Sequence, residues 1–119
     1  MQIRTKRIYQ QASDEDGRRI LVDRLWPRGI SKQAARIDYW AKEIAPSNQL
    51  RRWYQHDPDK WEAFRHRYFE ELDDNPHGVA ELRSRMEDAD TVTFLYSSKE
   101  ESLNNAAALR EYFENLSAG

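Results

Sequence analysis

Short runs of apolar and β-branched residues predict three strands. Residues 3–9 alternate basic with apolar or β-branched side chains, which is typical of an edge or half-buried strand. Residues 20–22 (ILV) and 91–96 (TVTFLY) are nearly continuous in apolar residues, as strands covered on both faces are. We therefore expect these two strands at the centre of a mainly parallel sheet. The residues expected to be buried there are Leu21, Val22, Phe94 and Leu95.

Apolar residues at helical spacing predict helices between and after these strands. The clearest start is Asp57 as N-cap followed by Pro58 at the first helical position. The inner face of that helix would carry Trp61, Phe64, Tyr68 and Leu72. Further helices are expected from Ser31 to residue 36, from Ser47 to residue 54, and around residues 79–86. The last helix is expected from a capping box at Ser98 and Glu101, with a buried stripe of Ala106, Leu109, Phe113 and Leu116.

Residues 37–44 (IDYWAKEI) allow two interpretations. Trp40 and Ile44 have helical spacing, but the β-branched and aromatic content favours a short strand. The long helical stretches between apolar strands imply crossover connections and therefore parallel pairing. We predict one small α/β domain over residues 1–119, with a mainly parallel sheet of three or four strands flanked by helices.

Composition excludes several functional classes. The chain has 119 residues, of which 39% are hydrophobic and 12% aromatic, which favours a folded domain over disorder. It has no cysteine, so disulfides, zinc ribbons, iron–sulfur clusters and thiol catalysis are excluded. We expect no metal site and no cofactor. Because no apolar run approaches membrane-spanning length and no export signal is present, we expect a cytoplasmic protein without membrane contact.

Charge is distributed unevenly along the chain. Residues 1–60 hold 13 Lys and Arg against 8 Asp and Glu, whereas residues 61–119 hold 6 against 13. The simpler interpretation is two solvated faces of one domain, and the alternative is an anion-binding front half. A nucleic-acid partner is not expected, because such domains usually have a pI above about 9 and this chain has a pI of about 5.9.

The candidate site lies where the two apolar strands end. Ligands of open α/β sheets bind beyond the carboxyl ends of the strands, which here lead into residues 23–24 and 96–99. The second segment enters a predicted helix, whose first N–H groups favour an anion. We therefore expect Arg24, Arg28 and Lys99 to bind phosphate or carboxylate. The glycine-rich GxGxxG and GxxxxGK[ST] phosphate loops are absent.

Several of these residues also have structural explanations. Asp23 can pair with a neighbouring arginine, and Asp57 is explained by its role as helix cap. His56 therefore lacks an obvious catalytic partner. Ser97 has no base beside it in the sequence, so we expect it to hydrogen bond to backbone rather than act as a nucleophile.

Four motifs together carry a family resemblance. They are DRLWPRG (23–29), KEIAPS (42–47), HDP (56–58) and LYSSKEESLNNA (95–106). The chain closely resembles the DUF488 family, in its YeaO-like branch, from about residue 3 to residue 116. The resemblance implies a small cytosolic α/β protein of a family without an assigned reaction. The positions it carries over as a shared site are Asp23, Arg24, Trp26, Arg28, Lys42, Glu43, His56, Asp57, Tyr96, Lys99 and Asn104.

The chain departs from the broader family in one respect. The resemblance to the broader family implies a cysteine where the last strand ends and a Cys-His-Arg stretch just beyond it. Here the corresponding segments read Tyr96-Ser97-Ser98 and Leu103-Asn104-Asn105. Thiol chemistry of that kind cannot operate in this chain, which favours binding over catalysis.

Three functional hypotheses follow. The favoured one is a module that binds a small anionic ligand, such as a phosphate, nucleotide or carboxylate, at the carboxyl edge of the sheet. The second is a hydrolase or transferase with Asp23 or Glu43 as general base and Arg28 as charge stabiliser. The third is a protein-interaction module that uses the acidic helices. The expected ligand-binding residues are Arg24, Trp26, Arg28, Lys42, Tyr96, Ser97, Lys99 and Asn104, and the catalytic candidates are Asp23, Glu43 and His56.

Overall fold

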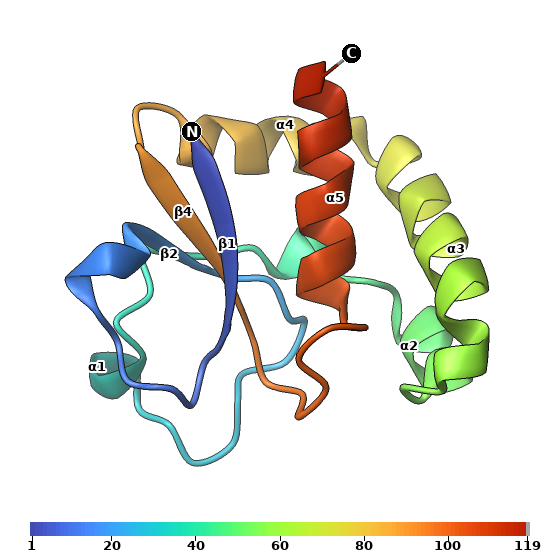
Figure 1. Cartoon of the computed structure of the whole chain (residues 1–119), viewed down its shortest axis with the longest axis horizontal. Coiled ribbons are helices and arrows are strands. Elements are labelled where there is room, and N and C mark those ends of the chain that lie inside the picture. The colour runs from blue at the N-terminus through green and yellow to red at the C-terminus, as the bar shows by residue number, and fades with distance from the viewer. Residues whose placement is uncertain (119) are drawn as a thin grey trace.

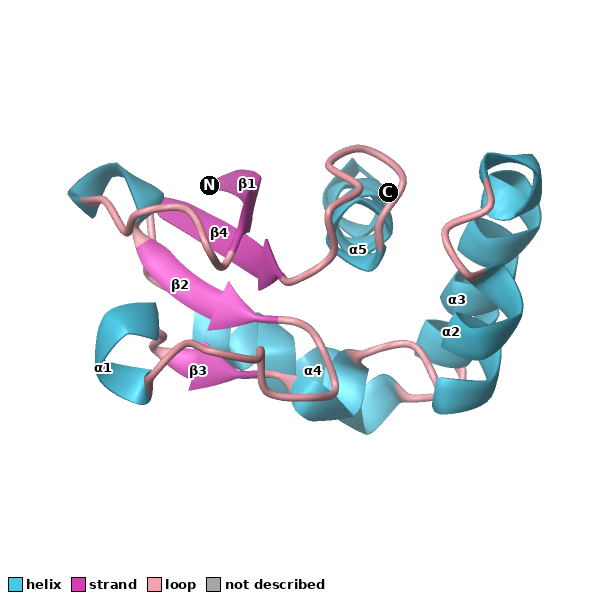
Figure 2. Ribbon diagram, turned by 90° about the horizontal axis from the view of Figure 1, so that it is seen from below, coloured by secondary structure: helices cyan, strands magenta, loops and turns pink. Residues whose placement is uncertain are grey.

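Four parallel strands form one sheet in the order β1-β4-β2-β3 (Figures 1 and 2). The structure is a computed structural model that describes residues 1–118. The strands are β1 (Gln2–Arg7), β2 (Arg18–Leu21), β3 (Tyr39–Trp40) and β4 (Thr91–Tyr96). The predicted parallel α/β arrangement is confirmed, and β2 and β4 are neighbours, as expected. The four residues expected to be buried at the centre of the sheet are fully buried.

Helices connect the strands and cover the sheet. The α-helices are α1 (Lys32–Ala35), α2 (Asn48–Tyr54), α3 (Trp61–Asp73), α4 (Pro76–Met86) and α5 (Asn105–Ala118). Three short 3-10 helices are η1 (Asp14–Asp16), η2 (Lys42–Ile44) and η3 (Pro58–Lys60). The predicted N-caps Ser31 and Ser47 are confirmed, because their side chains accept backbone N–H groups of α1 and α2. Asp57 caps the short helix η3, which leads directly into α3, rather than α3 itself. No helix among residues 1–118 combines the length and the apolar character needed to cross a membrane.

The alternating side chains of β2 and β4 pack into two separate cores. Ile20, Val22 and Phe94 point to the larger core, which the longer helices cover. Leu21 and Leu95 point to the smaller core, together with Ala35 of α1 and partly buried side chains of the connecting loops. Figures 1 and 2 both place α1 at one end of the molecule and α2 with α3 at the other, with the sheet and α5 between them.

Helix α3 presents the predicted apolar face to the larger core. Phe64, Tyr68 and Leu72 are buried, whereas Trp61 in the first turn is only partly buried. The Tyr68 hydroxyl donates to the Ile44 carbonyl oxygen over 2.7 Å. Burial raises the pKa of Tyr68 well above its ordinary value, so this phenol stays neutral and keeps its proton in that bond.

Two predicted boundaries differ from the structure. Residues 37–44, for which a strand and a helix were both considered, contain a piece of each: the two-residue strand β3 is followed by the 3-10 helix η2. The expected capping box at Ser98 and Glu101 is wrong, because residues 97–104 form a loop. Two N–H groups, of Ser102 and Leu103, bond to the Glu100 carboxylate within that loop.

Helix α5 therefore begins at Asn105, and the buried Asn104 side chain caps it by accepting the N–H of Ala107 over 2.9 Å. Ala106, Leu109 and Phe113 are buried as expected. Leu116 was expected in the same stripe but is 41% exposed. Figure 1 shows that the C-terminal end of α5 projects past the start of β1, and Leu116 lines an open hollow with residues of α4.

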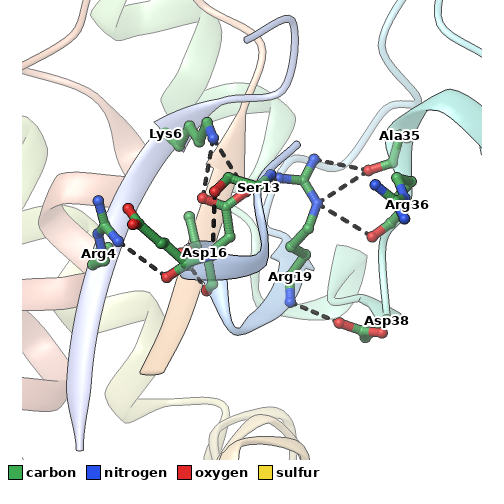
Figure 3. A network of polar contacts seen from close by, with 10 residues as sticks. Arg4, Lys6, Ser13, Asp16, Arg19, Ala35, Arg36 and Asp38 are labelled. Carbon is green, nitrogen blue, oxygen red and sulfur yellow. Dashed lines mark hydrogen bonds and ion pairs between the residues drawn. The ribbon is translucent and has the colours of Figure 1, made fainter. Parts of the chain in front are cut away.

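A buried charge network lies beside the smaller core (Figure 3). Asp16, at the end of η1, accepts hydrogen bonds from Lys6 of β1 and from Arg19 of β2. Arg19 is itself 5% exposed and also donates to the Ala35 and Arg36 carbonyl oxygens, where α1 ends. The Asp16 carboxylate thus connects η1 to β1 and β2, and Arg19 extends the network to the end of α1.

This network should make stability depend on pH. Burial raises the pKa of Asp16, but hydrogen bonds from the Ser13 N–H, Lys6 and Arg19 outweigh it, so the pKa lies below its ordinary value. A carboxyl with a lowered folded-state pKa stabilises the protein above its unfolded pKa of about 3.9, and that contribution is lost as pH falls through the folded value. Urea unfolding at pH values from 6 to 2 should show this loss. The free energy of unfolding should fall less steeply with decreasing pH in Asp16→Asn than in the wild type. Equal dependence on pH in the two proteins would contradict this role of Asp16.

Candidate functional site

A cavity of about 250 Å³ opens at the carboxyl ends of β2 and β4. Chain segments far apart in the sequence form its walls: the residues that follow these strands, the residues before and within α2, and the starts of α3 and α5. The lining residues are Asp23, Arg24, Ala45, Pro46, Arg51, Tyr54, His56, Phe64, Ser97, Ser98 and Asn105. The cavity therefore occupies the position that the parallel topology predicts for a ligand site.

Asp23 in the cavity wall forms hydrogen bonds that connect three parts of the chain. Its Oδ2 accepts the Ser97 N–H over 2.9 Å and the Ser97 hydroxyl over 2.7 Å. Its Oδ1 accepts from Nδ2 of Asn105 over 3.0 Å, and the same nitrogen donates to the Val22 carbonyl oxygen. Asp23 thus joins the end of β2 to the end of β4 and to the first turn of α5. With three donors on its two oxygens, the carboxylate is held in one orientation.

Two arginines and a histidine also line the cavity. Arg24 donates from Nη2 to the Ala45 carbonyl oxygen over 3.0 Å, which holds its guanidinium against the loop before α2. Arg51 is exposed on α2, where Nη2 donates to Oδ1 of Asn48. His56 follows the end of α2 and is exposed. Its left-handed backbone, with φ of 56°, follows another left-handed residue, Gln55, and this unusual pair turns the chain back at the cavity rim.

Two aromatic rings complete the wall. Tyr54 and Phe64 are buried and stack with their centroids 4.2 Å apart and an interplanar angle of 23°. The Tyr54 hydroxyl donates to the Leu103 carbonyl oxygen over 2.8 Å. Burial, with the nearby charges of Glu100 and Asp57, raises the pKa of Tyr54 to about 12. The ring is therefore uncharged at neutral pH and adds no negative charge to the wall.

Four of the predicted site residues line this cavity, and the others lie elsewhere. Asp23, Arg24, His56 and Ser97 line it. The remaining predicted residues, which are not among the lining residues, are Trp26, Arg28, Lys42, Glu43, Tyr96, Lys99 and Asn104.

Those remaining residues are exposed, partly buried or buried. Arg28, Lys42, Glu43 and Lys99 are exposed, and the Lys42 ammonium lies over the Trp40 ring. Trp26 is partly buried and donates its indole N–H to the Ile30 carbonyl oxygen.

Tyr96 and Asn104 are buried next to the cavity-forming loop. Burial is the main cause that raises the pKa of Tyr96, and Glu101 raises it further, while a hydrogen bond from Asn104 opposes the rise. Tyr96 therefore remains a neutral phenol beneath the loop, and Asn104 serves as the cap of α5. Their positions support the site from below.

Sequence reasoning missed several lining residues. Arg51, Tyr54, Phe64 and Asn105 were read only as parts of helices. One signal was present for Arg51, because Ser47 marks the start of a helix whose next turn holds it. No local pattern shows that this turn faces the end of β4. Among residues 1–118, no group of three or more His, Asp or Glu is arranged to hold a metal ion.

The family comparison agrees with the sequence motifs. Residues 2–118 match the family described as "Inactive DUF488-N3 subclade". The chain belongs to this DUF488-N3 subclade. The match spans almost the whole chain, which confirms the resemblance to DUF488 proteins suggested by the four motifs.

Two relatives are similar to this chain over nearly their full length. The uncharacterised protein YeaO of Escherichia coli is 39% identical over 119 residues, which cover 98% of this chain and 100% of YeaO. An uncharacterised protein of Mycobacterium tuberculosis is 39% identical over 109 residues, which cover 92% of this chain and 91% of that protein. No solved structure gives a significant match to this DUF488 chain.

Proposed function

We propose that this protein binds a small anion, a carboxylate or a phosphate, in the cavity at the carboxyl ends of β2 and β4. The observation that carries the proposal is the charge of the lining residues. Two arginines, Arg24 and Arg51, and one histidine, His56, accompany a single acid, Asp23, among the described residues of the wall. An arginine fork suits a two-oxygen grip on either anion.

The hydrogen bonds of Asp23 reinforce this charge balance. Its carboxylate already accepts three donors from Ser97 and Asn105. Arg24, by contrast, donates to the neutral backbone carbonyl oxygens of Ala45 and Pro46, and it forms no ion pair with a carboxylate among residues 1–118. An anion in the cavity would supply the missing negative charge.

Binding without chemical transformation fits the same residues better than hydrolysis or transfer. A general base must reach the proton it abstracts, and the two oxygens of Asp23 are engaged. Glu43, the other candidate base, belongs to η2 and lies outside this cavity, near His77 and Glu81. The printed description of the matched subclade, "Inactive", also favours binding over catalysis.

Replacing Arg51 tests the proposal directly. Arg51→Ala should weaken the binding of inorganic phosphate or acetate by about tenfold or more, because a charge-assisted hydrogen bond contributes about 1.5–3 kcal/mol. Arg52→Ala is the matched control, since Arg52 is the next residue on α2, is exposed, and is not among the residues that line the cavity. Arg28→Ala provides a second control outside the cavity. Isothermal titration calorimetry gives the dissociation constants.

The controls decide between a site and a general charge effect. Binding in the cavity requires a loss specific to Arg51→Ala, with both other variants within about twofold of the wild type. Equal losses in Arg51→Ala and Arg52→Ala would indicate diffuse attraction by the basic half of the chain. The absence of any measurable binding of either anion to the wild type would refute the proposed function.

A further inference from the structure

Part of the cavity wall is built from aromatic carbon. Tyr54 and Phe64 both line the cavity, and their rings are stacked against one another. The only proton of the Tyr54 hydroxyl is donated to the Leu103 carbonyl oxygen, so the ring is the main surface that Tyr54 has left for a ligand. Ala45 and Pro46 extend this apolar wall.

We propose that the natural ligand is an anion that carries a planar unsaturated ring, with its carboxylate or phosphate group at the arginines and its ring against Tyr54 and Phe64. This inference rests on the proposed function, because it places the anionic group in the same cavity. It adds the chemical class of the rest of the ligand.

Ring contacts give the reason for this preference. Aromatic rings in offset or edge-to-face contact stabilise one another beyond the burial of their apolar area. An arginine also stacks on a planar ring while it binds an anionic group. Arg24 and Arg51 line the same cavity as the two rings, so one small ligand could use both kinds of contact at once.

The backbone at the rim places a third planar group over the aromatic wall. Gln55 and His56 both have positive φ, a conformation that side chains other than glycine adopt at a cost. The result is that the His56 ring lies with its centroid 5.6 Å from that of Tyr54. A ligand ring that enters the cavity would therefore meet planar groups on the wall and at the rim.

The size of the cavity limits the ligand. Its volume of about 250 Å³ is below the range of about 300–1,000 Å³ that is usual for drug-sized ligands. A single ring with one anionic substituent suits this volume better than a dinucleotide does. The aromatic wall and the small volume together define a compact ring-bearing anion.

Two matched pairs of probes test the inference on the wild-type protein. Benzoate is compared with acetate, and phenyl phosphate with inorganic phosphate, by isothermal titration calorimetry. Within each pair the ring-bearing anion should bind about tenfold more tightly or better, because burial of the added ring adds apolar area and ring contacts. The pair with the lower dissociation constants shows whether carboxylate or phosphate is the preferred group.

Two variants locate the ring preference in the cavity. Tyr54→Leu should reduce the ratio of benzoate to acetate affinity by about fivefold or more, because it removes one ring of the wall. Trp53→Leu is the matched control, since Trp53 precedes Tyr54 on α2 and does not line the cavity. It should leave the ratio within about twofold of the wild-type value. Circular dichroism establishes that each variant is folded before titration.

Each outcome separates the inference from the proposed function. If acetate and phosphate bind but their ring-bearing partners bind no better, the ring preference is refuted while anion binding stands. If no probe binds, the proposed function itself fails. If the ring preference exists but responds equally to Tyr54→Leu and Trp53→Leu, the ring does not occupy this cavity and the inference is wrong.

Discussion

Phe64→Ala is expected to lower the free energy of unfolding by about 3–5 kcal/mol, the usual cost of removing a fully buried aromatic ring. Phe64 is 2% exposed. Its ring stacks on Tyr54 and Trp61 and lies 6.0 Å from the Tyr68 ring. Alanine would remove these contacts and leave a void that the neighbouring rings could fill only in part. Urea unfolding followed by tryptophan fluorescence measures the change.

An exposed leucine provides the control for the loss of apolar atoms. Leu25 is 60% exposed, so Leu25→Ala should change the free energy of unfolding by no more than about 0.5 kcal/mol. A loss below about 1 kcal/mol in Phe64→Ala would mean that this face of α3 is not packed in solution. In that case the aromatic face would have to be reassigned to contact with a partner.

Asp16→Asn is expected to have an effect of similar size for a different physical reason. The asparagine has nearly the same shape but no charge, so Arg19 would remain buried without a counter-ion. Removing one partner of a buried ion pair costs about 3–5 kcal/mol, because the remaining charge is neither hydrated nor neutralised. Lys6, which is also close to Asp16, would lose its partner as well. The free energy of unfolding at pH 7 is the quantity to measure.

An exposed ion pair is the control that shows whether burial causes the large loss of stability expected in Asp16→Asn. Glu114 pairs with Arg110 on α5, and the two side chains are 52% and 46% exposed. Glu114→Gln should therefore cost less than about 1 kcal/mol. If the Asp16 and Glu114 variants lost similar amounts of stability, the charge network of Figure 3 would not contribute more than an ordinary surface pair.

Local signals in the sequence predicted most of the elements correctly. A cap depends on a side chain and an N–H group two or three residues away, so Ser31, Ser47 and Asp57 could be recognised without knowing the fold. Burial of β2 and β4 also followed from their composition, because a strand covered on both faces needs apolar residues in succession. The start of α5 was predicted incorrectly, because the Ser98 hydroxyl donates to the Glu100 carbonyl oxygen and the Asn104 side chain is the one that caps the helix.

The general location of the candidate site was also predictable. Parallel strands bring their carboxyl ends to one edge of the sheet, so Asp23 and Ser97 could be placed together from topology alone. The chemistry of the wall was not predictable in this way, since Arg51, Tyr54 and Phe64 come from helices that lie between β3 and β4 in the chain.

The sequence by itself determined the caps at Ser31 and Ser47, the two central strands, the family and the edge of the sheet at which a ligand would bind. Tertiary structure alone decided which side chains meet there. Arg28 and Lys99 have the same charge as Arg51, but only Arg51 lies on a helix turn that the fold places against the end of β4. The physical reason is range: caps and strand composition act over a few residues, whereas the cavity depends on contacts such as Asp23 with Ser97, 74 residues apart.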